Sequence, residues 1–111
     1  MADSTPRMTM STQAVLRTLV AEPGSVRYGL EISAATGLPS GTIHPILARL
    51  ENLGWVHSDW EDIDPKSVGR PRRRYYQLSE HGLAMARNSL AQAHAARAKI
   101  VNRLRPIGET P

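Results

Sequence analysis

One long helical pattern at the end of the chain limits the folds open to it. The segment SEHGLAMARNSLAQAHAARAKIVNRLRP opens on Ser79 as a helix cap, carries helix formers throughout and stops before Pro106. A helix of about 26 residues would extend roughly 39 Å. The chain has 111 residues, which suffices for one small domain with a modest core. The core of so small a domain is too short to bury a helix of this length.

The same segment carries a seven-residue repeat that is typical of paired helices. Leucines recur at 83, 90 and 104 with Arg97 in the third place, and small or apolar residues lie beside them. Pairing with a second copy would bury this seam, so we expect a homodimer. The expected dimerisation residues are Leu83, Leu90, Arg97, Val101 and Leu104. The alternative is an alanine-rich, mostly solvated helix from which Arg97 extends into water.

Three shorter helical patterns precede this segment. The first begins near Ser11 and stops at Pro23 and Gly24, and the second covers YGLEISAATG with Gly37 as its end. The third, LPSGTIHPILARLENLGW, carries one apolar stripe: Ile43, Ile46, Leu47, Leu50 and Leu53. Pro45 lies inside that stripe, which favours a helix start close to Thr42, or a loosened first turn.

Two strand patterns, WVHSDWED and RRRYYQLS, flank a loop rich in Pro, Gly and Ser and predict a two-stranded hairpin. The fold class is therefore mainly α with a small β-hairpin: a winged helix-turn-helix followed by a long C-terminal dimerisation helix. We expect a flexible arm over 1–10, the DNA-binding domain over 11–78, the dimerisation helix over 79–105 and a flexible tail over 106–111.

Three stretches resemble the PadR family of bacterial transcriptional regulators: YGLEI (28–32), GTIHPILARLENLGWV (41–56) and GRPRRRYYQLSEHG (69–82). The resemblance covers roughly residues 12–85. It implies a winged helix-turn-helix that dimerises through its C-terminal helix, binds palindromic promoter DNA and usually represses. The chain departs from the family in having His44 where Tyr is common, and it resembles the short form, without a separate C-terminal domain.

The third helix and the hairpin supply the candidate DNA contacts. The face opposite the apolar stripe has small residues outermost, with Thr42 and Arg49 on one flank and His44 on the other, which suits a major groove. A solvated face is the alternative. For Tyr28 a phosphate contact and a packing role are equally favoured. The expected DNA-binding residues are Tyr28, Ser40, Thr42, His44, Pro45, Arg49, Lys66, Arg70, Arg72 and Arg73.

The basic run in the hairpin suits a narrow minor groove, although most charged turns are merely solvated. Arg70 and Arg72, nearest the tip, are the preferred contacts, whereas Arg74 is expected to pair with Asp59 or Glu61 of the facing strand. The aromatic residues of the hairpin are expected to form an apolar seam rather than to stack on bases.

Composition excludes several functions. A net charge of +4 and a pI near 10.1 favour a polyanionic partner, here double-stranded DNA. There is no cysteine, the four histidines lack metal-ligand spacing, and no catalytic motif is present, so we expect no metal, no cofactor and no enzyme activity. Neither a signal peptide nor an apolar membrane segment is visible, and we expect a cytoplasmic protein.

Two rival functions and one effector hypothesis remain. The chain could be a winged-helix protein-interaction module whose acidic stretch 59–64 and long C-terminal helix bind other proteins, while the arginines only keep the domain soluble. It could also be a non-specific architectural DNA binder. A flat aromatic effector could bind between the dimer helix and the DNA-binding body, near Tyr28, Trp55 and Trp60.

Overall fold

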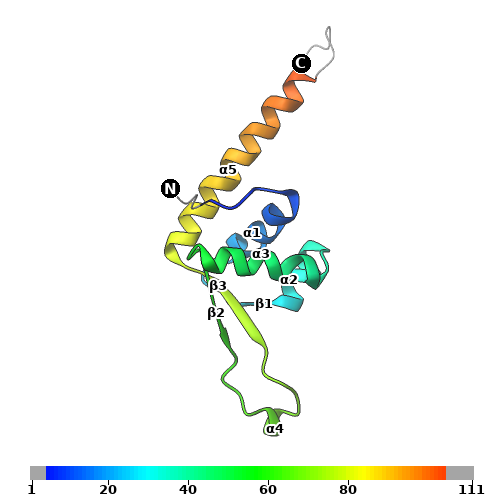
Figure 1. The fold of residues 1–111 in the computed structure, drawn as a ribbon, viewed down its shortest axis with the longest axis vertical. Coiled ribbons are helices and arrows are strands. Elements are labelled where there is room, and N and C mark those ends of the chain that lie inside the picture. Colours follow the sequence, from blue (N-terminus) through cyan, green and yellow to red (C-terminus); the bar gives the residue numbers. More distant parts are fainter. Residues whose placement is uncertain (1–4, 105–111) are drawn as a thin grey trace.

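The computed structural model describes residues 5–104, in which five helices and three short strands are arranged around one core (Figure 1). The hairpin and the last helix leave this body on opposite sides. The elements are α1 (Met10–Ala21), β1 (Arg27–Tyr28), α2 (Gly29–Thr36), α3 (Ser40–Asn52), β2 (Val56–Trp60), α4 (Pro65–Val68), β3 (Arg74–Leu78) and α5 (Glu80–Arg103).

The start of the chain is more ordered than the expected flexible arm over 1–10. Helix α1 begins at Met10, because the Thr9 side chain accepts a hydrogen bond from the Thr12 amide and caps the helix. Pro6 is buried and Met8 packs against the core. The expectation of an unstructured segment is therefore wrong for residues 5–10, while residues 1–4 and the expected tail over 106–111 lie outside the described residues.

In the described part of the chain the sheet has three antiparallel strands in the order β1-β3-β2, rather than the two expected. The two residues of β1 pair with the buried half of β3, where Tyr28 lies opposite Tyr75. In the hairpin, Val56 pairs with Leu78 and Trp60 with Arg74. A two-residue strand shows no alternation in sequence, because alternation needs about four residues to be visible.

The loop between β2 and β3 also contains one helical turn, α4, which was expected to be irregular. Asp64 caps it by accepting from the Lys66 amide, Pro65 begins it, and Gly69 ends it at φ 79°. These are the residues that favour a helix start and a left-handed end. The turn lies at the far tip of the hairpin (Figure 1).

The core lies where α1, α2, α3 and the base of the hairpin meet α5. Its fully buried side chains come from all five parts and include the largest, that of Trp55. They are Val15, Leu16, Leu19, Ile32, Ile43, Leu47, Leu50, Trp55 and Ala86. The stripe expected for the third helix is thus its buried face, with Ile46 and Leu53 partly buried beside it.

Helix α5 joins this core at one close backbone crossing. Ser79 caps the helix through the Gly82 amide, and its own amide donates to the Trp55 carbonyl oxygen at 2.9 Å. A Cβ at Gly82 would collide with the backbone of Trp55. Gly82 therefore lets the first turn of α5 approach the start of β2.

The structure divides the expected dimer seam in two. Leu83 and Leu90 are partly buried against the chain's own core, so they do not form one continuous free seam with the residues that follow. Arg97, Val101 and Leu104 are exposed, and Ile100 joins them. Val101 and Leu104 are 56% and 77% exposed, respectively. The first half of α5 belongs to the body, and the second half projects from it (Figure 1).

Gly82→Ala should destabilise the fold although alanine favours helices. Overpacking against a backbone costs about 1–3 kcal/mol or more and outweighs the gain of about 1 kcal/mol in helix propensity. We expect the Tm to fall by about 5 °C or more in thermal unfolding followed by circular dichroism. The matched control is Gly41→Ala in α3, where no atom lies within 4 Å of the added Cβ. Its Tm should stay the same or rise, and equal shifts for the two variants would refute the crossing.

Candidate nucleic-acid interface

The outer face of α3 is exposed as the sequence predicts, but the helix begins earlier. Ile43, Leu47 and Leu50 point into the core, whereas Gly41, His44, Pro45, Ala48, Arg49 and Asn52 are exposed. The first turn starts at Ser40, and the amides of Thr42 and Ile43 both donate to the Pro39 carbonyl. The expected start near Thr42 is therefore wrong, and Pro45 occupies the second turn. Proline at this position lacks the N–H that would bond to the Gly41 carbonyl, so one helix hydrogen bond is missing on the exposed side of α3.

The other predicted residues of this helix occupy both flanks of the exposed face. Ser40 and His44 line a cavity of about 210 Å³ between α2, α3 and β3, together with Tyr28, Leu30 and Arg73. Arg49 lies on the other flank and lines a different cavity. Thr42 is only half-exposed. His44 and Arg49 are thus separated by the helix, as their spacing predicts.

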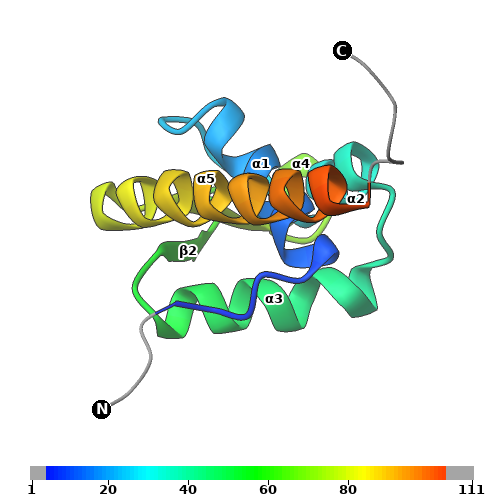
Figure 2. The same ribbon diagram turned by 90° about the horizontal axis from the view of Figure 1, so that it is seen from above.

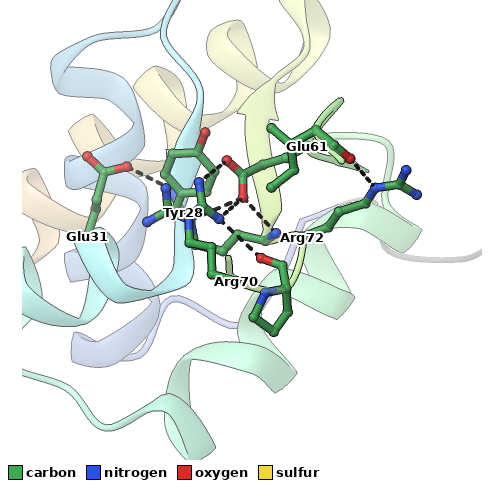
Figure 3. A network of polar contacts seen from close by, with 8 residues as sticks. Tyr28, Glu31, Glu61, Arg70 and Arg72 are labelled. Atoms are coloured by element: carbon green, nitrogen blue, oxygen red, sulfur yellow. Dashed lines mark hydrogen bonds and ion pairs between the residues drawn. The ribbon is translucent and has the colours of Figure 1, made fainter. Parts of the chain in front are cut away.

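Glu61, which sequence reasoning did not select for this role, organises the base of the basic loop (Figure 3). Both terminal nitrogens of Arg70 donate to its carboxylate, at 2.7 and 2.9 Å. The backbone amide and the Nε of Arg73 donate to the same carboxylate, at 2.7 and 3.1 Å. The Glu61 amide in turn donates to the Arg73 carbonyl, which extends the pairing of the two strands. The Glu61 side chain is only 9% exposed.

These contacts revise the roles expected for the arginines. We call the hairpin formed by β2, β3 and the loop between them the wing. Arg70 was a preferred DNA contact, but Glu61 holds it in a bidentate ion pair within the wing. Arg74 does not pair with Asp59 or Glu61; it donates to Ser58 Oγ at 2.7 Å and lies 3.7 Å from the carboxylate of Glu51. Because Ser58 also donates to Glu51 Oε1, this chain of contacts ties the wing to α3.

Arg72 and Lys66 keep their charges available. The Nε of Arg72 donates to the Ile63 carbonyl at 2.8 Å, and its two terminal nitrogens have no partner among residues 5–104 (Figure 3). Lys66 lies in α4, and its ammonium group is likewise unpaired in the described part of the chain. Both side chains are exposed. They remain candidate phosphate contacts near the tip.

The neighbouring arginines hold the pKa of Glu61 far below its usual range. The hydrogen bond from Arg70 is the largest cause; burial opposes it, and the hydrogen bonds from Arg73 lower the pKa further. A carboxylate of this kind stabilises the folded state above its unfolded pKa, about 4.3. That stabilisation disappears only as the pH falls through the lowered folded value. The network is therefore complete at every pH near neutrality.

Tyr28 has a packing role in the described structure. Its ring meets Tyr75 edge to face, with centroids 6.5 Å apart, and the Arg73 guanidinium lies 4.5 Å from the Tyr28 centroid. Its amide donates to Glu31 at the start of α2. Of the hairpin aromatics, Tyr76 and Trp55 are buried as expected, but Trp60 is 53% exposed and lies under Arg74.

The aromatic residues proposed for an effector do not enclose a common site. Trp55 is fully buried at the base of β2, and Trp60 is exposed at the far end of that strand. These residues therefore supply no shared pocket within the single chain, and the effector stays a prediction. Within residues 5–104 no group of acidic or histidine side chains is arranged to hold a metal ion. None of the helices described in this range is both long and apolar enough to cross a membrane.

A family profile decides the identification. The description "Transcriptional regulator PadR-like family" applies to the profile that matches residues 19–88, which is more than half of the chain. The chain belongs to this family. It is therefore a DNA-binding transcriptional regulator of the PadR-like family rather than an enzyme, which confirms the resemblance, the winged-helix fold class and the expected absence of catalysis.

Solved structures share this fold. A PadR family transcriptional regulator from Eggerthella lenta DSM 2243 is 20% identical, with a TM-score of 0.69 and coverage of 86% of each chain. A PadR-like transcriptional regulator from Bacillus cereus is 21% identical, with a TM-score of 0.60 and coverage of 84% of this chain and 88% of that one. No curated protein sequence matches the chain significantly.

One similar structure contains nucleic acid. Reduced AbfR bound to DNA is 26% identical to this chain, with a TM-score of 0.62. The alignment covers 80% of this chain and 59% of AbfR.

Glu61→Gln should loosen the wing without unfolding the body. The amide keeps the size of the carboxylate but lacks the charge that holds Arg70 and Arg73. We expect the backbone amides at position 61 and at Arg73 to exchange hydrogen about tenfold faster, while the core amides keep their protection. The measurement is hydrogen exchange followed by NMR or mass spectrometry.

Asp62→Asn is the matched control, because Asp62 is exposed and makes no ion pair within the described residues. It should leave the exchange rates unchanged. After correction for intrinsic rates, wild-type protection in the wing should also stay constant from about pH 8 to 5 and decline only below about pH 4. Equal exchange in the Glu61→Gln variant and the wild type would show that Glu61 does not order the wing.

Proposed function

We propose that the chain is a homodimeric repressor that reads a palindromic operator with α3 in the major groove and the wing in the adjacent minor groove. The observation that carries the proposal is the exposed face of α3, flanked on one side by a wing that its own ion pairs hold in place. Bound at a promoter, such a dimer would block polymerase.

The exposed residues of α3 suit contact with the floor of the DNA major groove. Its outermost residues, Gly41, Pro45 and Ala48, are small and exposed, so the helix backbone can approach base edges closely. His44 and Arg49 on the two flanks can reach hydrogen-bond acceptors, and Ala48 can contact a thymine methyl group.

The basic residues of the wing have two different roles, and this arrangement suits a minor groove. Glu61 pairs with Arg70 and Arg73, which shape the loop, whereas Arg72 and Lys66 present unpaired cations near its tip. Exposed cations on a narrow loop are attracted to the negative potential of a narrow minor groove. The fold shared with AbfR, which is described bound to DNA, supports a nucleic-acid role for these elements.

The projecting half of α5 supports the homodimer. Ile100, Val101 and Leu104 are each more than half exposed, although they are apolar and lie on one side of the helix. Burying them against the same residues of a second copy removes this surface from water. A two-fold dimer then presents two copies of α3 roughly 34 Å apart, about one turn of DNA.

The acidic residues of the stretch 59–64 bear on the rival function as a protein-interaction module. Glu61 binds arginines inside the hairpin, Asp64 caps α4 and Asp59 accepts from the Trp60 amide. The carboxylates of Asp59, Asp62 and Asp64 are nevertheless exposed and in no ion pair within residues 5–104. A protein-interaction module therefore stays the rival function, and DNA binding distinguishes the two.

Selection of bound duplexes from a random pool should enrich a palindrome. Two-fold symmetry predicts two inverted half-sites whose centres are about 10 base pairs apart, bound about a thousandfold or more tighter than unrelated DNA. Sequencing the bound fraction and measuring affinity at fixed salt check both points. A preference of only a few-fold for any duplex would favour the architectural DNA binder, and no DNA binding would favour the protein-interaction module.

Val101→Glu should convert the dimer to a monomer. It places two like charges in the proposed contact between the copies, whereas Val101 is exposed in the single chain and its replacement should leave the fold intact. Light scattering coupled to size exclusion would give the mass of one chain. Ala95→Glu is the matched control, because Ala95 is exposed on the opposite side of α5 and receives the same charge. A dimer that survives Val101→Glu but not Ala95→Glu would place the contact on the other face.

A further inference from the structure

A segment ahead of α1 borders α3 on the side away from the wing. We call residues 5–9 the N-terminal strap. Its position is fixed by buried Pro6, by Met8 against the core, and by the Gln13 side chain, which donates to the Met8 carbonyl at 2.9 Å. Figure 2 shows the strap passing along α3 before it turns into α1. The strap therefore packs against the body of the protein and lies beside α3.

The strap and α3 enclose a cavity of about 300 Å³. Its walls are Pro6, Arg7 and Thr9 from the strap, Thr12 from α1, and Pro45, Ile46, Arg49 and Leu50 from α3. The wing lines the cavity of about 210 Å³ described above, which lies on the His44 side of α3. The exposed face of α3 therefore has the wing along one edge and the strap along the other.

The charges of this cavity are uncompensated. Arg7 and Arg49 both line it and both are exposed, and no acidic residue is among its walls. Neither guanidinium forms an ion pair or hydrogen bond within residues 5–104, in contrast to Arg70, Arg73 and Arg74 of the wing. Two unpaired guanidinium groups that line one cavity, at the edge of an exposed helix face, are the kind of donors that bind an anion.

We propose that Arg7 and Arg49 together bind one backbone phosphate of the DNA strand that borders the major groove on the side away from the wing. This inference rests on the proposed function, since it assumes that α3 enters that groove. A phosphate has enough oxygens to accept from both guanidinium groups, and it lies at the groove edge, where the flank of an inserted helix comes to rest. The strap thereby becomes a second DNA-contacting flank, opposite the wing.

The test measures affinity for the selected duplex as a function of salt for Arg7→Ala, Arg49→Ala and the double variant. Each single change should weaken binding about three- to tenfold, because the phosphate keeps only one of its two partners. The double variant leaves that phosphate without a partner and should reduce the salt slope by about 0.9 per protomer. Because both side chains hold the same phosphate, the losses of affinity in the two single variants should not simply add in the double variant. Unchanged Tm values would show that the variants fold.

Arg17→Ala is the matched control. Arg17 is also exposed and unpaired among the described residues, but it lines a cavity between α1 and α2 that α3 does not reach. Its salt slope should equal that of the wild type. Additive effects in the double variant would overturn the shared phosphate, and an Arg7→Ala affinity equal to that of the wild type would remove Arg7 from the interface.

Two further outcomes separate this inference from others. Calorimetric titration with inorganic phosphate should show no binding at micromolar concentrations, and tight binding abolished by Arg7→Ala would instead make the cavity a small-anion site. If wild type bound no duplex at all, the proposed function would fail. If wild type bound its palindrome and Arg7→Ala bound it with the same affinity, only the strap inference would fail.

Discussion

The Trp55 carbonyl group lies where the core, the wing and helix α5 are connected. It accepts the Ser79 amide, which ends the hairpin and starts α5, and Gly82 leaves room for the helix to pass over it. The Trp55 ring is at the same time the largest fully buried side chain. Core, wing and projecting helix therefore meet at one residue, so the wing and the free half of α5 extend from a common rigid base.

The sequence predicts the parts of the fold that rest on long patterns. The apolar stripe from Ile43 to Leu53 determines which face of α3 is buried, and Ser79 marks the start of α5. Short features were missed because their signals are weak: β1 has two residues and α4 has four. The start of α3 was misplaced because Pro45 was expected in a first turn, whereas an exposed second turn also tolerates it.

The candidate site was harder to predict than the fold, because it depends on which charges find partners. Arg70 and Arg72 look equivalent in sequence, yet Arg70 is engaged by Glu61 and Arg72 keeps its terminal nitrogens free. The strand register decides this, since pairing Trp60 with Arg74 brings Glu61 beside Arg73. A correct register could have identified Glu61 from the sequence. Arg7 could not have been found in this way, because its position depends on the burial of Pro6.

The division of α5 makes the helix a rigid spacer in the proposed dimer. Its first half belongs to the DNA-binding body, and its second half carries the exposed apolar residues at 100, 101 and 104. Each residue between them contributes about 1.5 Å and 100° of rotation. The length of this helix therefore sets both the distance and the relative orientation of the two bodies. Operator spacing would then evolve through insertions or deletions in α5, independently of the residues that read bases.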